Sequence, residues 1–320
     1  MENELYSRKR GQAVQPLLED GLGLRLGFLT FVSMTKGTLI FILYLVAAVT
    51  AQLVFGAFPV TAFEFPVNSA VLFAGIVGLW VLYRERPDLG LSRWLASGKT
   101  SVLLILAFLA CCLVLGMVTQ LSPAEIAAGD SSGFLGVRDV AHAWWFIAIA
   151  MALMANLLVV IFSRAGKTRF LLNHVGVFLA LAGGFFGAPD TEILRIPVYE
   201  GKASREAFTQ DGRMETLAYD LSMETFVKEA DASGGVRNYK ATVSVGESRA
   251  EIRVNHPYRK DAFEDIYLVS YDQSHPEPEY CVLEIVRQPW KYIIWLGVVM
   301  MMAGCVLMFA QGAEKQGEKI

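Results

Sequence analysis

Charged residues are scarce in this sequence, and cysteines are scarcer still. Asp, Glu, Lys and Arg make up 18% of the 320 residues, and a net charge of -3 without a large basic cluster gives no support to nucleic-acid binding. The four cysteines form no C-x-x-C pair, which argues against a thioredoxin-like redox role or a thiolate metal site. The sequence has no G-x-S-x-G, H-E-x-x-H or Walker A pattern, so the common hydrolase and nucleotide-binding signatures are absent.

Long apolar runs dominate what is present. Hydrophobic residues make up 54% of the chain and the mean hydropathy is +0.42, values typical of an integral membrane protein. A transmembrane helix needs about 20 mostly apolar residues. Six stretches approach this length, at residues 37–58, 68–83, 101–120, 143–163, 170–188 and 291–311.

Basic residues in the short connections predict the orientation of these spans. Lys and Arg collect before the first span, between the second and third, and between the fourth and fifth, which are therefore expected to be cytoplasmic. The connection AFPVTAFEFPVN has no basic residue and LSPAEIAAGDSSGFLGVRDVAH has only Arg138, so both are expected outside. Both termini are then cytoplasmic. The first run begins beyond residue 36 with no cleavage site after it, and it is expected to remain in the mature protein.

The long segment at 189–289 has an ordinary soluble composition and is expected on the outer side. Its apolar residues alternate in short runs such as YKATVSVG and DIYLVSYDQ, bounded by Gly, Pro, Asn and Asp, which is typical of half-buried strands. About 100 residues suffice for an independent core. The sequence predicts a β-rich domain, sandwich-like or a partial barrel, inserted before the last helix. DASGGVRN is expected to be a flexible turn within it.

The histidines are few, and one lies inside a predicted span. An ionisable imidazole in lipid is costly, so His174 in the fifth span indicates ligation, proton handling or substrate passage. The alternative is a histidine that bonds to a neighbouring helix or reaches to the interface. His142 opens the fourth span at the outer face, where water makes a histidine cheap and a purely structural role is favoured. It could still reach a ligand held between helices. His256 and His275 precede prolines and are expected to be solvated turn residues.

Several local patterns in one order resemble a known family. LGMVTQ is followed by RDVAHAWWFIAIAMALMANLL, NHVGVFLALAGGFFG, IRVNHPY, YLVSYD and QPWKYIIWLGVVMMMAGCVLMF. From about residue 101 to 311 the chain is similar to the ResB/CcsB family of system II cytochrome c biogenesis. The first two spans are additional to that family's four-helix core, and Ala143 replaces the Ser expected before the tryptophan pair.

The resemblance implies a role in carrying haem b across or along the membrane to apocytochrome c. In that family, haem in the membrane is thought to be held by two histidines shared with a partner. His174 is the first candidate axial ligand of the haem iron and His142 the second. The chain lacks the partner's tryptophan-rich WWD segment, so the resemblance implies a CcsA/ResC-type haem-handling membrane protein as partner. The chain is expected to be a subunit of a cytochrome c synthase, or haem lyase, that is not catalytic alone.

The resemblance also implies the cytoplasmic (inner) membrane of a bacterium, with the β-rich domain in the periplasm. The alternative function is a membrane-anchored scaffold or receptor whose outer β domain binds a protein without haem. A proton-driven transporter is disfavoured because acidic residues are absent from all six spans. The expected organisation is a cytoplasmic tail with a possible interfacial helix over 14–33 (1–36), two additional helices (37–100), core helices (101–188), the β-rich domain (189–289), the last helix (290–311) and a cytoplasmic tail (312–320).

Overall fold

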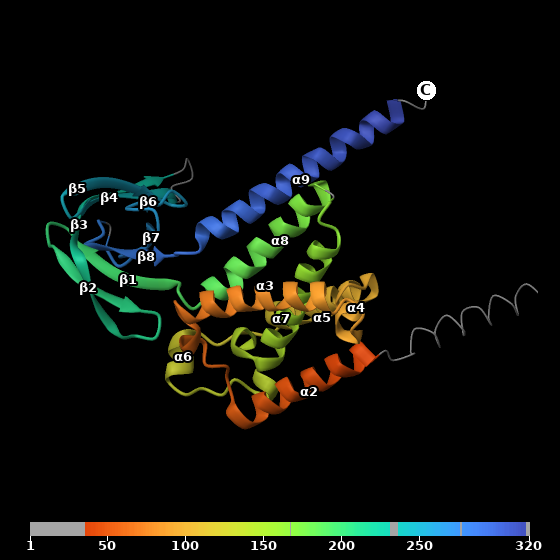
Figure 1. Ribbon diagram of the computed structural model, residues 1–320. Helices are drawn as coiled ribbons and strands as arrows, with labels where there is room; N and C mark the ends of the chain where they lie inside the picture. The colour runs from red at the N-terminus through yellow and green to blue at the C-terminus, as the bar shows by residue number, and fades with distance from the viewer. Residues whose placement is uncertain (1–35, 167, 231–235, 276, 318–320) are drawn as a thin grey trace, which may run out of the picture.

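The computed structural model describes residues 36–166, 168–230, 236–275 and 277–317. The interfacial helix expected over 14–33, the centre of the turn DASGGVRN and the last three residues lie outside this part. Figure 1 shows the helices grouped on one side of the molecule and the sheet at one end of them. The start of α2 and the end of α9 lie on the side away from the sheet (Figure 1).

Within the described residues, six helices are long and apolar enough to cross a membrane, so this is a multi-pass membrane protein. They are α2 (Lys36–Phe55), α3 (Val67–Glu85), α5 (Gly98–Met117), α7 (Trp144–Ser163), α8 (Thr168–Gly187) and α9 (Lys291–Gly317). Short helices connect them: η1 (Val60–Phe63), α4 (Gly90–Leu95), α6 (Pro123–Ala127), η2 (Phe134–Gly136) and η3 (Val140–His142). All six predicted spans are confirmed as helices.

The first and third predicted spans end three residues too late; α2 ends at Phe55 and not at residue 58. The third span ends at Met117 and not at residue 120, because Val118 is extended and the Gln120 side chain donates to the carbonyls of Val118 and Val137. The membrane-spanning part of the last helix, Lys291–Ala310, agrees with the predicted span 291–311, and the helix itself continues to Gly317. The sequence there, AEKQ, consists of good helix formers, so the helix continues after the apolar run ends.

Helix α7 is the centre of the helical part. It contacts α2, α3, α5 and α8, and over half of the residues in its membrane-spanning stretch are buried within the molecule. Asn156 in its middle donates from Nδ2 to the carbonyl oxygen of Leu95 at 2.6 Å. This bond between helices holds α4 against α7.

Helices α8 and α9 lie side by side (Figure 1). Glycines allow their backbones to approach closely: a Cβ added to Gly176 would lie 2.7 Å from the Gly297 oxygen, and one added to Gly297 would lie 2.6 Å from the Gly176 oxygen. Gly187 likewise accommodates the Trp290 side chain. Because the segment that forms the sheet lies between these two helices in the chain, their contact holds the entry and the exit of that segment close together.

The domain between α8 and α9 forms, in its described residues, one antiparallel sheet. Its strands are β1 (Glu192–Tyr199), β2 (Ser204–Thr209), β3 (Met214–Ala230), β4 (Val236–Val245), β5 (Ser248–Arg253), β6 (Tyr258–Arg259), β7 (Glu264–Tyr271) and β8 (Tyr280–Arg287). Their order is β5-β4-β3-β2-β1-β8-β7-β6. The sheet curves until β5 contacts β6 and β7 at its other end. Of the two architectures expected from the sequence, a sandwich-like domain and a partial barrel, one continuous curved sheet fits the partial barrel.

The inner face of this curved sheet forms the domain's core. Side chains from strands at both ends and in the middle are fully buried together, among them Leu194, Ile196, Ile252, Ile266 and Leu283. Alternate residues of β1 and β8 point into it, which is the period-2 pattern expected from the sequence.

A polar network joins the helices to the sheet. Asp190, between α8 and β1, accepts hydrogen bonds from the Phe65 backbone N–H, the Asn68 side-chain amide and the Trp290 indole N–H. Asn68 is fully buried and also donates to the Phe186 carbonyl at 2.7 Å. This carboxylate thus connects the start of α3 with the end of α8 and the start of α9.

Candidate functional site: two cavities that meet at His142

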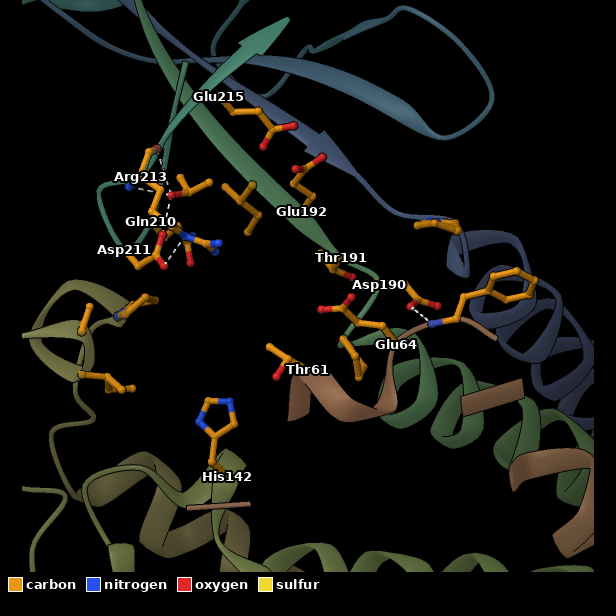
Figure 2. A pocket seen from close by; sticks show the side chains of 18 of the residues that line it. Thr61, Glu64, His142, Asp190, Thr191, Glu192, Gln210, Asp211, Arg213 and Glu215 are labelled. Atoms are coloured by element: carbon orange, nitrogen blue, oxygen red, sulfur yellow. Dashed lines mark hydrogen bonds and ion pairs between the residues drawn. The ribbon is translucent and has the colours of Figure 1, made fainter. Parts of the chain in front are cut away.

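Two cavities lie where the helices meet the sheet. One is a polar cavity of about 1130 Å³ between η1, α6 and the strands β1 to β3, shown in Figure 2. The other is an apolar pocket of about 610 Å³ between η1, α3, α7 and α8. His142 lines both of them. Of the histidines in the described part of the chain, it alone lines either cavity.

The apolar pocket has walls of aliphatic and aromatic side chains. Phe58 and Phe63 close it on the η1 side, and Phe146 and Phe185 from α7 and α8 lie with ring centroids 5.5 Å apart. Gly184 leaves room on α8, because a Cβ added there would meet no heavy atom within 4 Å. The volume is within the range of about 300–1,000 Å³ usual for small-molecule sites. The pocket thus combines apolar walls with one imidazole that could bind a metal.

The polar cavity is rich in carboxylates. Its lining includes Glu64, Asp190, Glu192, Asp211 and Glu215. Figure 2 shows Glu192 and Glu215 close together on the sheet side. The pKa of Glu215 is raised, first because the Glu192 side chain hydrogen-bonds to it, which is how a carboxyl pair holds a proton.

Cations only partly offset this negative charge. Arg213 lines the cavity, but its Nε pairs with Asp211 at 2.8 Å. Arg287 pairs with Glu192 at 2.6 Å and lies 3.7 Å from Glu215. The wall therefore stays acidic, and such a surface attracts basic partners and repels anions.

The segment before α7 holds His142 in a defined place. The backbone N–H of Phe58 donates to the His142 carbonyl at 2.7 Å, and the Trp144 N–H donates to Oε1 of Gln52 at 3.0 Å. The Trp145 indole donates to the Leu135 carbonyl. These bonds come from positions far apart in sequence, so the end of α2 and the loop before η3 fix the histidine from two sides.

The imidazole of His142 is half-buried and paired with a buried carboxylate. Its Nδ1 lies 2.6 Å from Oδ1 of Asp139, whose side chain is 9% exposed. The Asp139 hydrogen bond is the largest cause that raises the pKa of His142 above its ordinary value, against the opposing effect of burial. With Nδ1 bonded to a carboxylate, the nitrogen left to meet a ligand is Nε2.

His174 has a different environment. It lies in the first half of α8, half-buried, with Nδ1 2.9 Å from the Phe170 carbonyl oxygen one turn earlier. Its ring stacks on that of Phe170 at a centroid distance of 3.7 Å. It lines neither of the two cavities. By helical spacing it shares a face with Leu181 and Phe185, which do line the apolar pocket.

The two candidate histidines lie too far apart to bind one iron. From His174 to Gly187, α8 rises by about 20 Å at about 1.5 Å per residue. His142 lies just before the start of α7, whereas His174 lies near the start of α8, which follows closely on the last residue of α7, so the two histidines lie at opposite ends of the pair formed by α7 and α8. A metal–imidazole bond is only about 2 Å long. Each histidine would therefore need a separate haem position or a second ligand from another chain.

The other candidate residues behave as expected from the sequence. His256 and His275 are exposed in turns of the outer domain. Among the described residues, no group of three or more His, Cys, Asp or Glu side chains could hold a metal ion. Sequence reasoning missed Asp139 and the carboxylates Glu192 and Glu215. The i, i+3 spacing of Asp139 and His142 was the one local signal; the other contacts depend on tertiary structure.

Comparisons with known proteins give a family match and a remote structural likeness. Residues 163–279 match the model of the ResB-like family. No curated protein matches the chain. Among solved structures, the chain resembles a cytochrome c haem lyase, CcmF, at 14% identity and a TM-score of 0.34. That match covers 75% of this chain and 44% of the other, so the chain spans less than half of the length of that protein.

Proposed function

We propose that this chain, a ResB-like protein with a role in cytochrome c biogenesis, is a haem-handling membrane subunit of a system II cytochrome c synthase. Haem b is the substrate that it holds in the apolar pocket between η1, α3, α7 and α8. His142 supplies Nε2 to the iron at the outer end of the pocket. The observation that carries this proposal is the coincidence of an apolar pocket of about 610 Å³ with an oriented imidazole in its wall.

His174 is proposed to act earlier on the haem path, nearer the cytoplasmic side. Its Nδ1 is engaged by the Phe170 carbonyl, which leaves Nε2 for iron, and its helix face leads to Leu181 and Phe185 in the pocket wall. The distance along α8 argues for two positions used in turn and against one shared position. A CcsA-type partner would supply the second axial ligand at each position, since this chain offers a single imidazole there.

The proposed orientation has both termini in the cytoplasm and the sheet in the periplasm of a bacterial inner membrane. Arg84 lies in the last turn of α3, Arg86 and Arg93 come after that helix, and Arg164 follows α7, whereas the sheet is entered from the opposite end of α8. The apolar pocket then opens toward the outer face, where apocytochrome c is modified. The acidic wall of the polar cavity suits a basic acceptor segment by charge complementarity.

The test is the absorption spectrum of the full chain purified with a CcsA-type partner, without added haem. The expected wild-type result is a b-type spectrum. His142→Ala should lose most of the haem, and His174→Ala should also lower haem content because loading from the cytoplasmic side is interrupted. His256→Ala is the matched control, since that histidine is exposed and lies outside both cavities.

A colourless wild-type complex would contradict the proposal and favour the scaffold alternative, in which both histidines tolerate Ala. Retention of the full spectrum by His142→Ala would remove this residue from haem ligation, and the same result for His174→Ala would remove that residue. Maturation of a co-expressed c-type cytochrome, measured by covalent haem on the acceptor, gives the functional readout for each variant.

A further inference from the structure

We propose that Asp139 is a positioning residue for His142: its carboxylate fixes the imidazole and strengthens Nε2 as an iron ligand. This inference rests on the proposed function, because it concerns the same histidine. It assigns a role to a residue that the family match does not cover, since that match begins at residue 163.

The geometry supports a dedicated pair. Oδ1 of Asp139 lies 2.6 Å from Nδ1 of His142, and this is the single side-chain hydrogen bond of Asp139 recorded in the described part of the chain. The carboxylate accepts, so Nδ1 carries the proton and Nε2 presents its lone pair. Figure 2 shows the imidazole of His142 pointing into the space between the cavity walls.

The local fold does not need this carboxylate. The turn that carries the pair is held by other bonds: Gln120 Oε1 accepts from the Val140 N–H at 3.0 Å, and the Leu121 N–H donates to the Arg138 carbonyl at 2.7 Å. Val140 itself is fully buried. The backbone N–H of Asp139 bonds to Gly136 and not to a side chain. Removing the charge should therefore leave the turn in place.

Burying a carboxylate costs free energy, so the position of Asp139 indicates a role for it beside His142. Asp139 is 8% exposed, and in the described residues the one ionisable group paired with it is a half-exposed histidine. Histidines that bind metals usually donate their second ring N–H to such a partner, which fixes the ring and raises its basicity. A carboxylate partner donates more electron density than a neutral one, and it stabilises ferric relative to ferrous haem.

The experiment compares Asp139→Asn with wild type in the complex with the CcsA-type partner. Asn has the same shape and keeps a neutral acceptor, so the ring stays bonded but the charge is lost. The expected results are haem binding weakened by about 10- to 100-fold and a midpoint potential shifted to more positive values. Asp130→Asn is the matched control, because Asp130 is an exposed residue of the same connection and makes the same charge change.

A double-mutant cycle separates positioning from a general structural effect. In a His142→Ala background, Asp139→Asn should cause no further loss of haem affinity, because the residue acts through the missing imidazole. Additive losses would overturn the inference. So would an unchanged potential and affinity in Asp139→Asn while His142→Ala still loses haem, a result that leaves the proposed function intact. Haem retained by His142→Ala would instead overturn both.

Discussion

An imidazole's chemistry depends on what its two nitrogens touch, and at the residue scale this separates the two candidate ligands. His174 bonds to its own helix and stacks on Phe170, whereas His142 bonds to a carboxylate and faces two cavities. The sequence identified both residues but ranked the one in the span first. Hydropathy predicts how deep a residue lies in the membrane. It does not predict the neighbours of a ring nitrogen, because Phe58 and Gln52, which contact the loop that carries His142, are far from it in the chain.

A second Asp–His pair, in the β-rich domain, predicts how the stability of the turn that carries it depends on pH. Asp272 is buried and His275 is exposed, with Oδ2 and Nδ1 2.7 Å apart. The His275 hydrogen bond is the main cause that lowers the pKa of Asp272 to about 2, and Asp272 raises the pKa of His275. Asp272 also accepts from the N–H groups of Ser274 and Glu279.

The pair should stabilise this turn most between about pH 4 and 6.5, where both groups are charged. The contribution of His275 is complete below its unfolded pKa and is lost as pH rises through the raised folded value. That of Asp272 is complete above its unfolded pKa and is lost as pH falls through about 2. Hydrogen-exchange protection factors of the Ser274 and Glu279 amides measure this. Equal protection at pH 6 and pH 9 would contradict it, and His275→Asn should remove the difference.

At the element scale, helix lengths follow apolar runs but helix pairing follows small residues. The sequence predicted all six spans, because each apolar run has bilayer length. It did not predict that α8 pairs with α9, which a sheet separates from it in the chain. Gly176 and Gly297 carry that pairing through direct backbone contact. The β-rich domain shows the same limit of the sequence. The alternation of apolar residues predicted its strands, but it does not show which strands pair, and strand pairing decides between a single curved sheet and a sandwich.

Close contact between α8 and α9 predicts a marked difference between two glycine substitutions. Gly297→Ala places a Cβ 2.6 Å from a backbone oxygen and should destabilise the protein by about 1–3 kcal/mol. Gly75→Ala in α3 meets no heavy atom within 4 Å and should be neutral or slightly stabilising. Thermal unfolding of each purified variant in detergent compares them. Equal midpoints would show that α8 and α9 do not pack in this way.

At the scale of the whole molecule, the first two spans belong to the site. The sequence left the role of residues 1–100 open, because these helices precede the segment similar to known relatives. In the structure, Gln52 at the end of α2 binds the backbone of Trp144, and Asn68 on α3 joins the pocket wall to Asp190. Side chains of η1 and α3 also line the apolar pocket. The helices on either side of residue 100 thus pack as one unit in the described part of the chain.

The central claim, that haem occupies the apolar pocket, can be tested by filling it. Gly184→Leu adds a side chain where a Cβ meets no atom within 4 Å, so the backbone of α8 need not move. Gly75→Leu makes the same change on α3 at a position with equal space outside the pocket. The measurement is haem bound per protein in the complex with the CcsA-type partner. We expect Gly184→Leu to lose haem while Gly75→Leu matches wild type; equal haem in all three would contradict this account.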